Sequence, residues 1–477
     1  MAGSAGASES AGADDGGAGA GGAWVVPDGV AISEISFWQA LRVPLELKGA
    51  NVPPNAPLIV NKGGILRVYV APDEGFQARP LSALLEFGGP TTAQPFESKK
   101  LIRGASVDGQ FTSTFNFPLD ASAVLPNSSY SVTLSDSSDG QVLDRFPKAG
   151  RADLGVVSVS PSNALQLMIV PLTVAGIEPD ISAPTLATFR ARLLAMYPLA
   201  EVSISTHARI TSEIAVGPEK GWDELLDSLY ALRAAETPAA NVFYYGLFTP
   251  KQSFDDYCVT NCTVGYSIIA DADDVDSRGS VGLGIFSDGS NSDAPDTMAH
   301  ELGHALGRDH APCDVTLQDS GPFPYPGGKI GVWGFDSLNH SLLDPQAYGD
   351  VMGYCSPDWI SDFTYRALFE RLSSVNAELS AKSLWPTPTL NAYRRVLLRA
   401  DGSLRWGSRF TPSRVPRGEI REVSLLGEDG SAVGAVAAAF QRFGDAPGGF
   451  LLVPEAVLDA NSGIAAIRVG SSLLPTR

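Results

Sequence analysis

The sequence has little positive charge and no long apolar run. It carries 34 Lys and Arg residues against 53 Asp and Glu residues, so its formal net charge is −19. An acidic surface of this size repels phosphate backbones and anionic lipids, which excludes nucleic acids and membrane surfaces as partners. The longest apolar stretch, Leu165–Ile177, is shorter than the roughly 18 residues of a membrane span and is interrupted by Pro171. We therefore expect no transmembrane segment in this chain.

Cysteine is also scarce, with four copies in 477 residues. Cys258 and Cys262 lie in one short loop, and the other two are Cys313 and Cys355. Pairing 258 with 262 and 313 with 355 is the simplest of the three arrangements that four cysteines allow. Two disulfides indicate an oxidising compartment, and four reduced structural thiols are the alternative. A zinc site made of these cysteines is disfavoured, because no second pair has finger spacing.

The first 23 residues are almost all Gly, Ala and Ser. Such a segment buries too little apolar surface to fold, which predicts a flexible linker. It lacks the basic region and apolar core of a signal peptide. It resembles the linker that follows the lipid-anchoring cysteine of bacterial lipoproteins. This resemblance implies a protein secreted or tethered to the outside of the cell, with its anchor outside this sequence.

The rest of the chain divides into three parts, about the number that its length predicts. Residues 24–160 carry short alternating strands between Pro- and Gly-rich turns, which predicts a β-sandwich. Residues 161–383 alternate strands with helices, which predicts a mixed, mostly parallel sheet. Residues 384–477 return to short alternating runs and indicate a second, smaller β-sandwich. The predicted fold class is multi-domain α+β, with a central α/β domain between two β domains.

The most informative stretch is HELGHALGRDH, which begins at His300. His300 and His304 are four residues apart, so on a helix they share one face and can reach one metal ion. Glu301 lies off that line and can reach a water molecule. Gly307 can adopt positive φ and end the helix, which turns the chain back and brings His310 to the metal. Three protein ligands with a fourth position left for water are typical of a catalytic zinc site.

This motif matches the metzincin clan of zinc endopeptidases at every defining position, and the sequence resembles the clan over about residues 165–380. The resemblance implies a methionine turn beneath the zinc, which Met352 in the stretch DVMGYC fits. It also implies that Tyr354 binds the metal or hydrogen-bonds the oxyanion, and a core tyrosine is the alternative. Ala311 and Asp350 depart from the astacin and serralysin patterns, so we assign the chain to neither subgroup.

Together these residues predict a secreted, monomeric zinc endopeptidase that cleaves proteins or glycoproteins. Zinc would lower the pKa of a bound water towards about 7, Glu301 would take its proton and pass it to the leaving amine, and Tyr354 would stabilise the oxyanion with the zinc. The substrate is expected to extend the sheet beside Val281–Phe286. Two alternatives stay open: an adhesin or carbohydrate-binding protein with a vestigial zinc domain, and a zinc hydrolase of non-peptide amides.

Three further groups of residues suggest weaker hypotheses. The acidic stretch Asp271–Asp276 could bind calcium, and a solvated acidic loop is the alternative. His207 and His340 each stand alone, which favours surface or core packing over metal binding. Neither β domain offers a cluster of metal ligands or a nucleophile with its base, so we expect the whole site to lie in the central domain.

Overall fold

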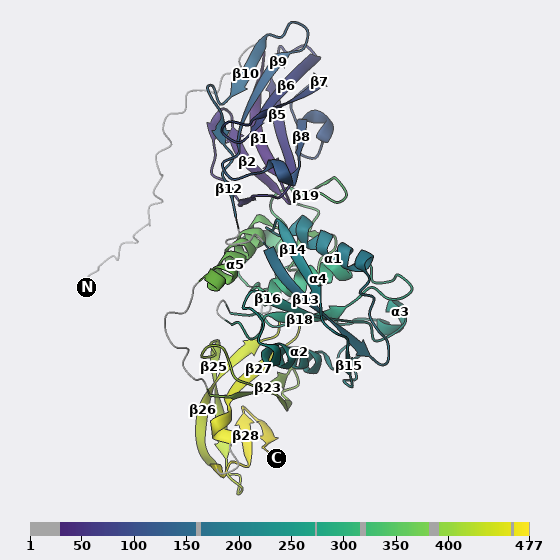
Figure 1. The fold of residues 1–477 in the computed structure, drawn as a ribbon, viewed down its shortest axis with the longest axis vertical. Coiled ribbons are helices and arrows are strands. Elements are labelled where there is room, and N and C mark those ends of the chain that lie inside the picture. Colours follow the sequence, from purple (N-terminus) through teal and green to yellow (C-terminus); the bar gives the residue numbers. More distant parts are fainter. Residues whose placement is uncertain are drawn as a thin grey trace, which may run out of the picture.

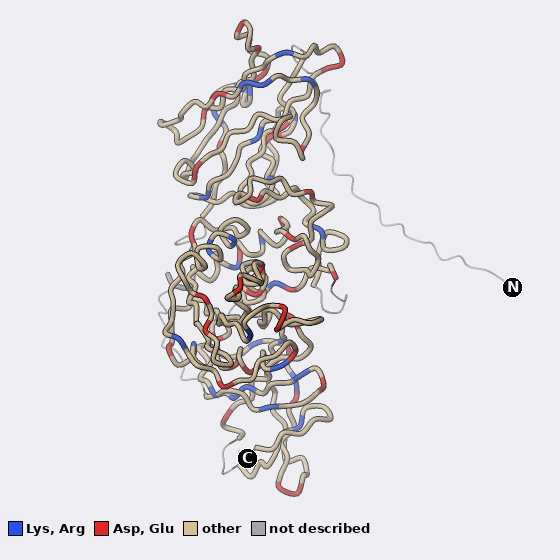
Figure 2. The backbone as a smooth tube through the Cα atoms, turned by 90° about the vertical axis from the view of Figure 1, so that its right-hand side faces the viewer, with Lys and Arg blue, Asp and Glu red and all other residues tan. Residues whose placement is uncertain are grey.

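The computed structural model describes residues 29–158, 164–271, 274–314, 321–380, 391–458 and 462–476. The predicted linker over residues 1–23 lies outside this part of the chain. The molecule is elongated, with an N-terminal β region at one end, a central region that carries the long helices, and a C-terminal β region at the other end (Figure 1). Acidic and basic residues are mixed along its length (Figure 2). None of the described helices is long and apolar enough to cross a membrane.

The N-terminal region forms the predicted sandwich of two antiparallel sheets. One has the strand order β3-β2-β1-β5-β8, and the other has β10-β9-β6-β7, with β11 beside β9. Alternate residues of each sheet point inward, so Phe37 and Val68 of the first sheet share a core with Leu85 and Val132 of the second. The elements are β1 (Val30–Trp38), β2 (Arg42–Leu47), β3 (Ala50–Asn51), β4 (Leu58–Ile59), β5 (Gly64–Pro72), β6 (Arg79–Gly88), β7 (Gln94–Ile102), η2 (Phe111–Ser113), β8 (Phe115–Leu119), η3 (Ala121–Ala123), β9 (Ser129–Asp136), β10 (Val142–Phe146), β11 (Ala152–Asp153) and β12 (Val156–Val157).

The central region is built on a sheet of order β14-β13-β16-β18-β17. Pairing is parallel from β14 to β18, and only β17 runs antiparallel, as predicted for a mixed, mostly parallel sheet. Its elements are β13 (Ala164–Val174), α1 (Ala183–Met196), β14 (Glu201–Thr206), β15 (Ile210–Ser212), α2 (Trp222–Glu236), β16 (Val242–Phe248), α3 (Phe254–Tyr257), β17 (Gly265–Ser267), β18 (Gly279–Leu283), α4 (Ala294–Ala305), η4 (Pro326–Gly328), β19 (Gly334–Asp336), β20 (Ser341–Leu343), β21 (Gly349–Asp350), β22 (Asp358–Trp359) and α5 (Asp362–Ser380).

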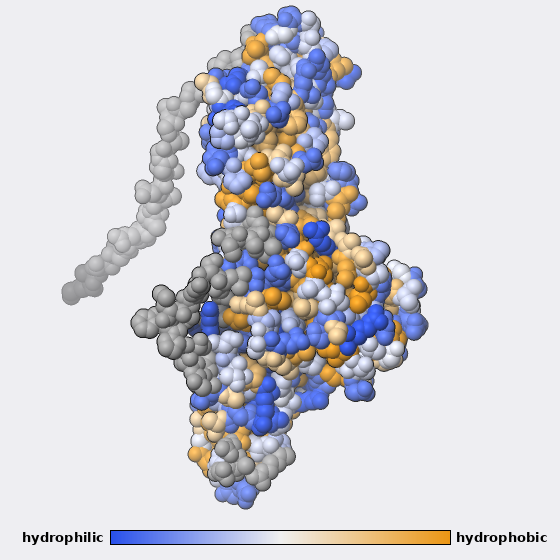
Figure 3. Space-filling view, in the orientation of Figure 1, coloured by the Kyte–Doolittle hydropathy of each residue, from blue (hydrophilic) through white to orange (hydrophobic). Residues whose placement is uncertain are grey.

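Helices cover both faces of this sheet. Phe243 and Tyr245 of β16 point into the core shared with α1, α4 and α5, whereas Tyr244 and Phe248 point into a second core with α2. Because β16 is buried on both faces, its sequence is an almost continuous apolar run. In the view of Figure 3, apolar residues gather over the central region and near its junction with the N-terminal region.

The edge of the sheet is not where the sequence predicted it. We expected Val281–Phe286 to be the exposed edge, but β18 pairs with β16 on one side and with β17 on the other. The chain turns back after the Cys258–Cys262 loop and adds Gly265–Ser267 antiparallel to β18. The sequence indicates a strand near Tyr266, but its pattern does not tell beside which strand so short a segment pairs. The outer edge that faces the site therefore belongs to β17.

The C-terminal region is a single curled sheet and not the predicted second sandwich. Its strand order is β24-β23-β27-β26-β25-β28-β29, and the Trp406 indole on β24 donates to the carbonyl of Pro475 on β29 (2.6 Å), so the two ends of the sheet meet. On β27, Leu451 faces the core of the curled sheet while Phe450 faces α2. One sheet suffices here because its other face is covered by the central region. Its elements are β23 (Tyr393–Arg399), β24 (Leu404–Phe410), β25 (Glu419–Leu426), β26 (Ala432–Arg442), β27 (Gly448–Pro454), η5 (Glu455–Leu458), β28 (Ala466–Val469) and β29 (Ser472–Pro475).

Both predicted disulfides are present. Cys258 pairs with Cys262, and Cys313 pairs with Cys355. The second bond joins the segment after the third histidine to the end of the methionine turn, two segments that are 42 residues apart in the sequence. Closing a loop of that length is expected to stabilise the fold by about 2–4 kcal/mol, mainly by restricting the unfolded chain.

Candidate active site

Helix α4 presents the central motif. It starts with Pro295 in its first turn, where a missing N–H is tolerated, and it carries His300, Glu301 and His304 on buried turns. The chain turns back at Gly307, whose φ is +80°. A Cβ there would also lie 2.9 Å from the carbonyl oxygen of Ala270, so glycine is required both for its conformation and for space. This turn brings His310 beside the two helical histidines.

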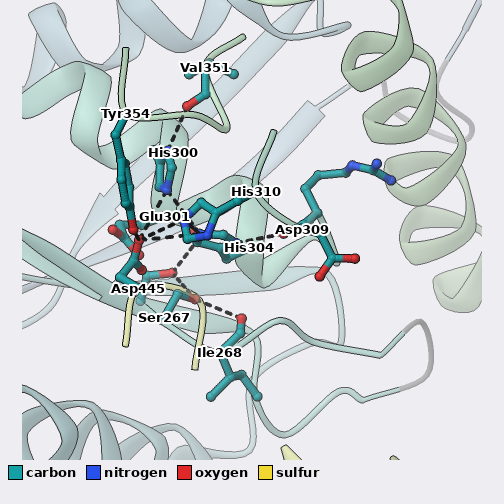
Figure 4. Close-up of polar contacts among 12 residues, drawn as sticks. Ser267, Ile268, His300, Glu301, His304, Asp309, His310, Val351, Tyr354 and Asp445 are labelled. Carbon is teal, nitrogen blue, oxygen red and sulfur yellow. Dashed lines mark hydrogen bonds and ion pairs between the residues drawn. The ribbon is translucent and has the colours of Figure 1, made fainter. Parts of the chain in front are cut away.

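The three imidazoles converge through their Nε2 atoms (Figure 4). The Nε2 of His304 lies 3.0 Å from that of His300 and 3.2 Å from that of His310. The Nδ1 atoms of His300 and His304 each face a backbone carbonyl at 2.7 Å, from Val351 and Arg308. A carbonyl only accepts, so in His300 and His304 the Nδ1 atom carries the proton and the Nε2 atom keeps its lone pair. The Nδ1 atom of His310 is buried without a hydrogen-bond partner among the described residues. Three Nε2 atoms that face one another can hold one cation between them, and zinc suits this set of donors.

A fourth residue joins this cluster from the C-terminal region. Asp445, in the turn between β26 and β27, places Oδ1 3.3 Å from the Nε2 atoms of His300 and His310 and 3.5 Å from that of His304. Burial by itself would raise the pKa of Asp445, but the imidazoles, His304 foremost, hold that pKa well below its usual range. Among the residues that the structure describes, these four form the group that could hold a metal ion.

Asp445 corrects the expectation that the flanking regions contribute nothing to the site. It lies 135 residues after His310, in the turn FGDAPGG. Glycine and proline mark that stretch as a turn, but nothing in it resembles a metal ligand motif. The contact arises because the C-terminal sheet packs against α2 and β17 and directs this turn towards α4.

Glu301 lies beside the histidines and under the edge strand. Its side chain is almost fully buried, and a Cβ at Gly265 of β17 would overlap its carboxyl group. Glycine in the strand therefore makes room for the carboxylate. Burial, and then the charge of Asp445, raise the pKa of Glu301 well above its usual range. A carboxyl group with a raised pKa next to a metal site suits the transfer of a proton.

The turn that carries Met352 packs against α4, the helix of His300 and His304. Met352 is buried, and its sulfur packs so closely on α4 that a Cβ at Gly303 would overlap it. Asp350, one of the departures from the known subgroups, accepts hydrogen bonds from the N–H groups of Met352 (2.9 Å) and Ser361 (3.0 Å). Its carboxylate thereby ties the turn to the start of α5. The other departure, Ala311, is fully buried and donates its N–H to the Met352 carbonyl at 2.8 Å.

Tyr354 completes the set of residues that the sequence singled out. Its ring stacks on His300, with centroids 5.7 Å apart, and meets the ring of His310 edge to face at 4.8 Å. Its hydroxyl donates to Oδ1 of Asp445 at 3.0 Å. The side chain is half exposed, so it lies at the mouth of the site and not in the core.

Cavities open on both sides of Asp445. One, of about 780 Å³, is lined by Gly265, Glu301, Tyr354, Trp359 and Asp445 among others. The other, of about 410 Å³, contains Tyr354 and Asp445 as well, together with His310 and residues of the C-terminal sheet. The turn that carries Asp445 therefore stands between two parts of the space around the histidines.

The weaker candidates lie elsewhere. His207 contacts the Ala208 carbonyl and the Glu236 carboxylate (2.7 Å), and His340 is exposed in a turn. Neither joins the cluster of histidines. In the acidic stretch, residues 272–273 lie outside the described residues. Asp274 accepts from Gln441 and Asp276 accepts from Ser413 (2.8 Å), so these carboxylates hold the C-terminal region. Calcium in this loop stays a prediction.

Comparison with known proteins adds one informative match. The family described as Peptidase M66 matches residues 268–356, a range that contains the histidine motif and the methionine turn. No curated protein matches the chain. Two solved structures of Bacteroides uniformis beta-glucuronidase 2 are similar: a calcium-binding mutant (8% identity, 46% of this chain, 29% of that chain, TM-score 0.18) and the enzyme covalently bound to cyclophellitol-6-carboxylate aziridine (10%, 46%, 24%, 0.18).

A chaperone–substrate complex is a further similar structure, with 15% identity, coverage of 55% of this chain and 40% of that chain, and a TM-score of 0.24. The chain thus spans less than half the length of each of these three solved chains. Scores this low carry no argument about fold or function. The family match over the histidine motif supports a peptidase.

Proposed function

We propose that this protein is a zinc-dependent endopeptidase of the metzincin type that cleaves proteins or glycoproteins outside the cell. The observation that carries the proposal is the convergence of three Nε2 atoms beside a buried glutamate. The family match over the same residues supports it, and the two disulfides suit an extracellular location.

His300, His304 and His310 would hold the zinc ion, which acts as a Lewis acid when bound. Glu301 lies next to them and lines the larger cavity, where it takes the proton of the attacking water and passes it to the leaving nitrogen. The Tyr354 hydroxyl lies at the mouth of the site and donates to the oxygen that becomes negative in the transition state. Met352 supports the imidazoles from below.

The outer edge of β17 gives the substrate a place to bind. Its Ser267 carbonyl and the N–H of the adjacent Ile269 point away from β18 towards the C-terminal turn, since both bond to that turn. An extended peptide that adds to this edge would pass Glu301 and the histidines, because Gly265 lies directly over the glutamate.

The test is to remove the proton carrier and keep the metal ligands. Glu301→Ala should retain one zinc per chain, measured by atomic absorption, and should lose about 10²–10⁴-fold in the rate of peptide cleavage. Cleavage is measured by mass spectrometry on a proteome-derived peptide library, which also reveals the sequence preference. Glu428→Ala, at an exposed position of the C-terminal region, is the control. A Glu301→Ala protein that cleaves as fast as a control with measurable activity would refute the proposal.

A further inference from the structure

The turn between β26 and β27 occupies the place that an extended substrate would take. The Ile269 N–H donates to the Arg442 carbonyl at 3.0 Å, and the Gly444 N–H donates to the Ser267 carbonyl at 2.8 Å. Between these bonds, Ile268 and Phe443 form an antiparallel bridge. The C-terminal region thus adds a short strand to the edge of the catalytic sheet, as peptide ligands do in other proteins.

The side chains of this turn fit the surface closely. Phe443 is 1% exposed and packs between Tyr266 of β17 and Phe450 of β27, with ring centroids 4.9 and 5.0 Å away. At Gly444, a Cβ would lie 2.5 Å from Cδ2 of His304, so only glycine allows the backbone to approach this histidine. An apolar anchor followed by glycine delivers the next residue, Asp445, directly to the imidazoles.

Asp445 lies where a metal-bound water would be expected in an open catalytic site. Its Oδ1 faces all three Nε2 atoms and also receives the Tyr354 hydroxyl, while its Oδ2 is buried without a hydrogen-bond partner. Carboxylate oxygen is a good zinc ligand, and a fourth protein ligand is typical of closed zinc sites and not of catalytic ones. Asp445 therefore occupies the ligand position expected for water. It also engages the Tyr354 hydroxyl, which would otherwise stabilise the oxyanion.

We infer that the C-terminal region is a built-in inhibitor: Asp445 is the fourth ligand of the metal, Arg442–Gly444 block the substrate edge, and the chain is latent until this turn moves away. The inference rests on the proposed function. The closed state is held mainly by apolar side chains of both regions that share one core. Arg399 adds ion pairs with Asp223 (2.6 Å) and Glu224 (2.7 Å) on α2. Departure of the turn would join the two cavities on either side of Asp445 into one cleft.

Access to the metal can be measured without any cleavage. The full-length chain is loaded with Co²⁺ in place of zinc, and acetohydroxamate, a small bidentate ligand, is titrated while the visible absorption of the cobalt is recorded. Because the wild-type site is available only in its open fraction, its apparent affinity is reduced by that fraction. Asp445→Ala and the isosteric Asp445→Asn should each bind acetohydroxamate at least about tenfold more tightly than the wild type.

Asp429→Asn, in an exposed turn of the same sheet, is the matched control and should bind as the wild type does. Circular dichroism verifies that each variant is folded. If Asp445→Ala does not fold, Asp445→Asn alone still tests the inference. Equal affinity in the wild type and both Asp445 variants would overturn the inference and leave the peptidase proposal intact. Tighter acetohydroxamate binding without cleavage of the peptide library by either variant would support a closed metal site and refute the peptidase.

Discussion

The two flanking regions are both made of β-sheets and both pack on the central region, yet they approach the site from different sides. The N-terminal sandwich contacts the floor of the site, whereas the C-terminal sheet covers its front. Contacts of the first kind support His300, and in the proposed function contacts of the second kind compete with the substrate. Two regions of similar secondary structure thus have opposite effects on one site, one supporting it and the other covering it. The effect depends on which face of the central region each sheet packs against.

A chain of hydrogen bonds links the N-terminal sandwich to a histidine. The Ala40 carbonyl accepts from the indole of Trp359 at 2.7 Å. The Trp359 carbonyl accepts from the Val351 N–H at 2.6 Å. The Val351 carbonyl faces Nδ1 of His300 at 2.7 Å. The N-terminal region therefore helps to orient His300, although none of its own side chains lies in the cluster of histidines and Asp445.

The largest effect is expected from breaking this support. Trp359 is 1% exposed, so Trp359→Ala should lower the free energy of unfolding by about 3–5 kcal/mol through the cavity it leaves. Trp359→Phe keeps most of the apolar contact and loses the hydrogen bond to Ala40, for which about 1 kcal/mol is expected. Urea denaturation followed by circular dichroism measures both. If the two variants lose the same amount, the packing of the indole is not what supports the floor.

A second test concerns a lysine between the sandwich and α1. The Lys62 amine donates to the Leu194 and Tyr197 carbonyls, the latter at 3.1 Å. Burial lowers its pKa from 10.5 to about 7. Since the folded pKa lies below the unfolded one, the folded state binds fewer protons, and stability rises with pH between about 7 and 10.5. From pH 7 to pH 9 the wild type should gain about 2 kcal/mol relative to Lys62→Met.

Denaturation at both pH values, with Lys251→Met at an exposed position as the control, measures this difference. The control should follow the wild type. Parallel pH profiles for the wild type and Lys62→Met would show that Lys62 is charged in the folded protein. The N-terminal contact would then depend on an ammonium group at the end of α1 and not on a neutral amine.

The smallest effect is expected on the C-terminal side. Arg399 is partly exposed, and its pairs with Asp223 and Glu224 are screened by solvent. Arg399→Ala should therefore lower the free energy of unfolding by less than about 1 kcal/mol. Thermal denaturation at low and high salt measures it, with Arg405→Ala, which removes a neighbouring partner of Glu224, for comparison. A loss as large as that of Trp359→Ala would mean that charge, and not the shared apolar core, holds the inhibitory region in place.

Much of the site could be predicted from the sequence because its pattern is local. The spacing of His300 and His304 follows from the helical turn, and Gly307 permits the reversal that brings in His310. The alternation of strands and helices predicted the central sheet, and the positions of the four cysteines predicted both disulfides as the simplest pairing. Most of these inferences depend on residues that are close in sequence. They could therefore be made without knowing how the elements pack.

Three features were decided by tertiary structure alone. The place of β17 at the edge of the sheet depends on where the chain returns after a disulfide loop, and no local pattern reports that place. The C-terminal region became one sheet and not two, because α2 covers the face that a second sheet would have covered. Asp445 is an ordinary acidic residue of a turn until the packing of that sheet brings it to the histidines. Sequence patterns report the conformation of neighbours along the chain, whereas a contact across 135 residues depends on how whole sheets pack.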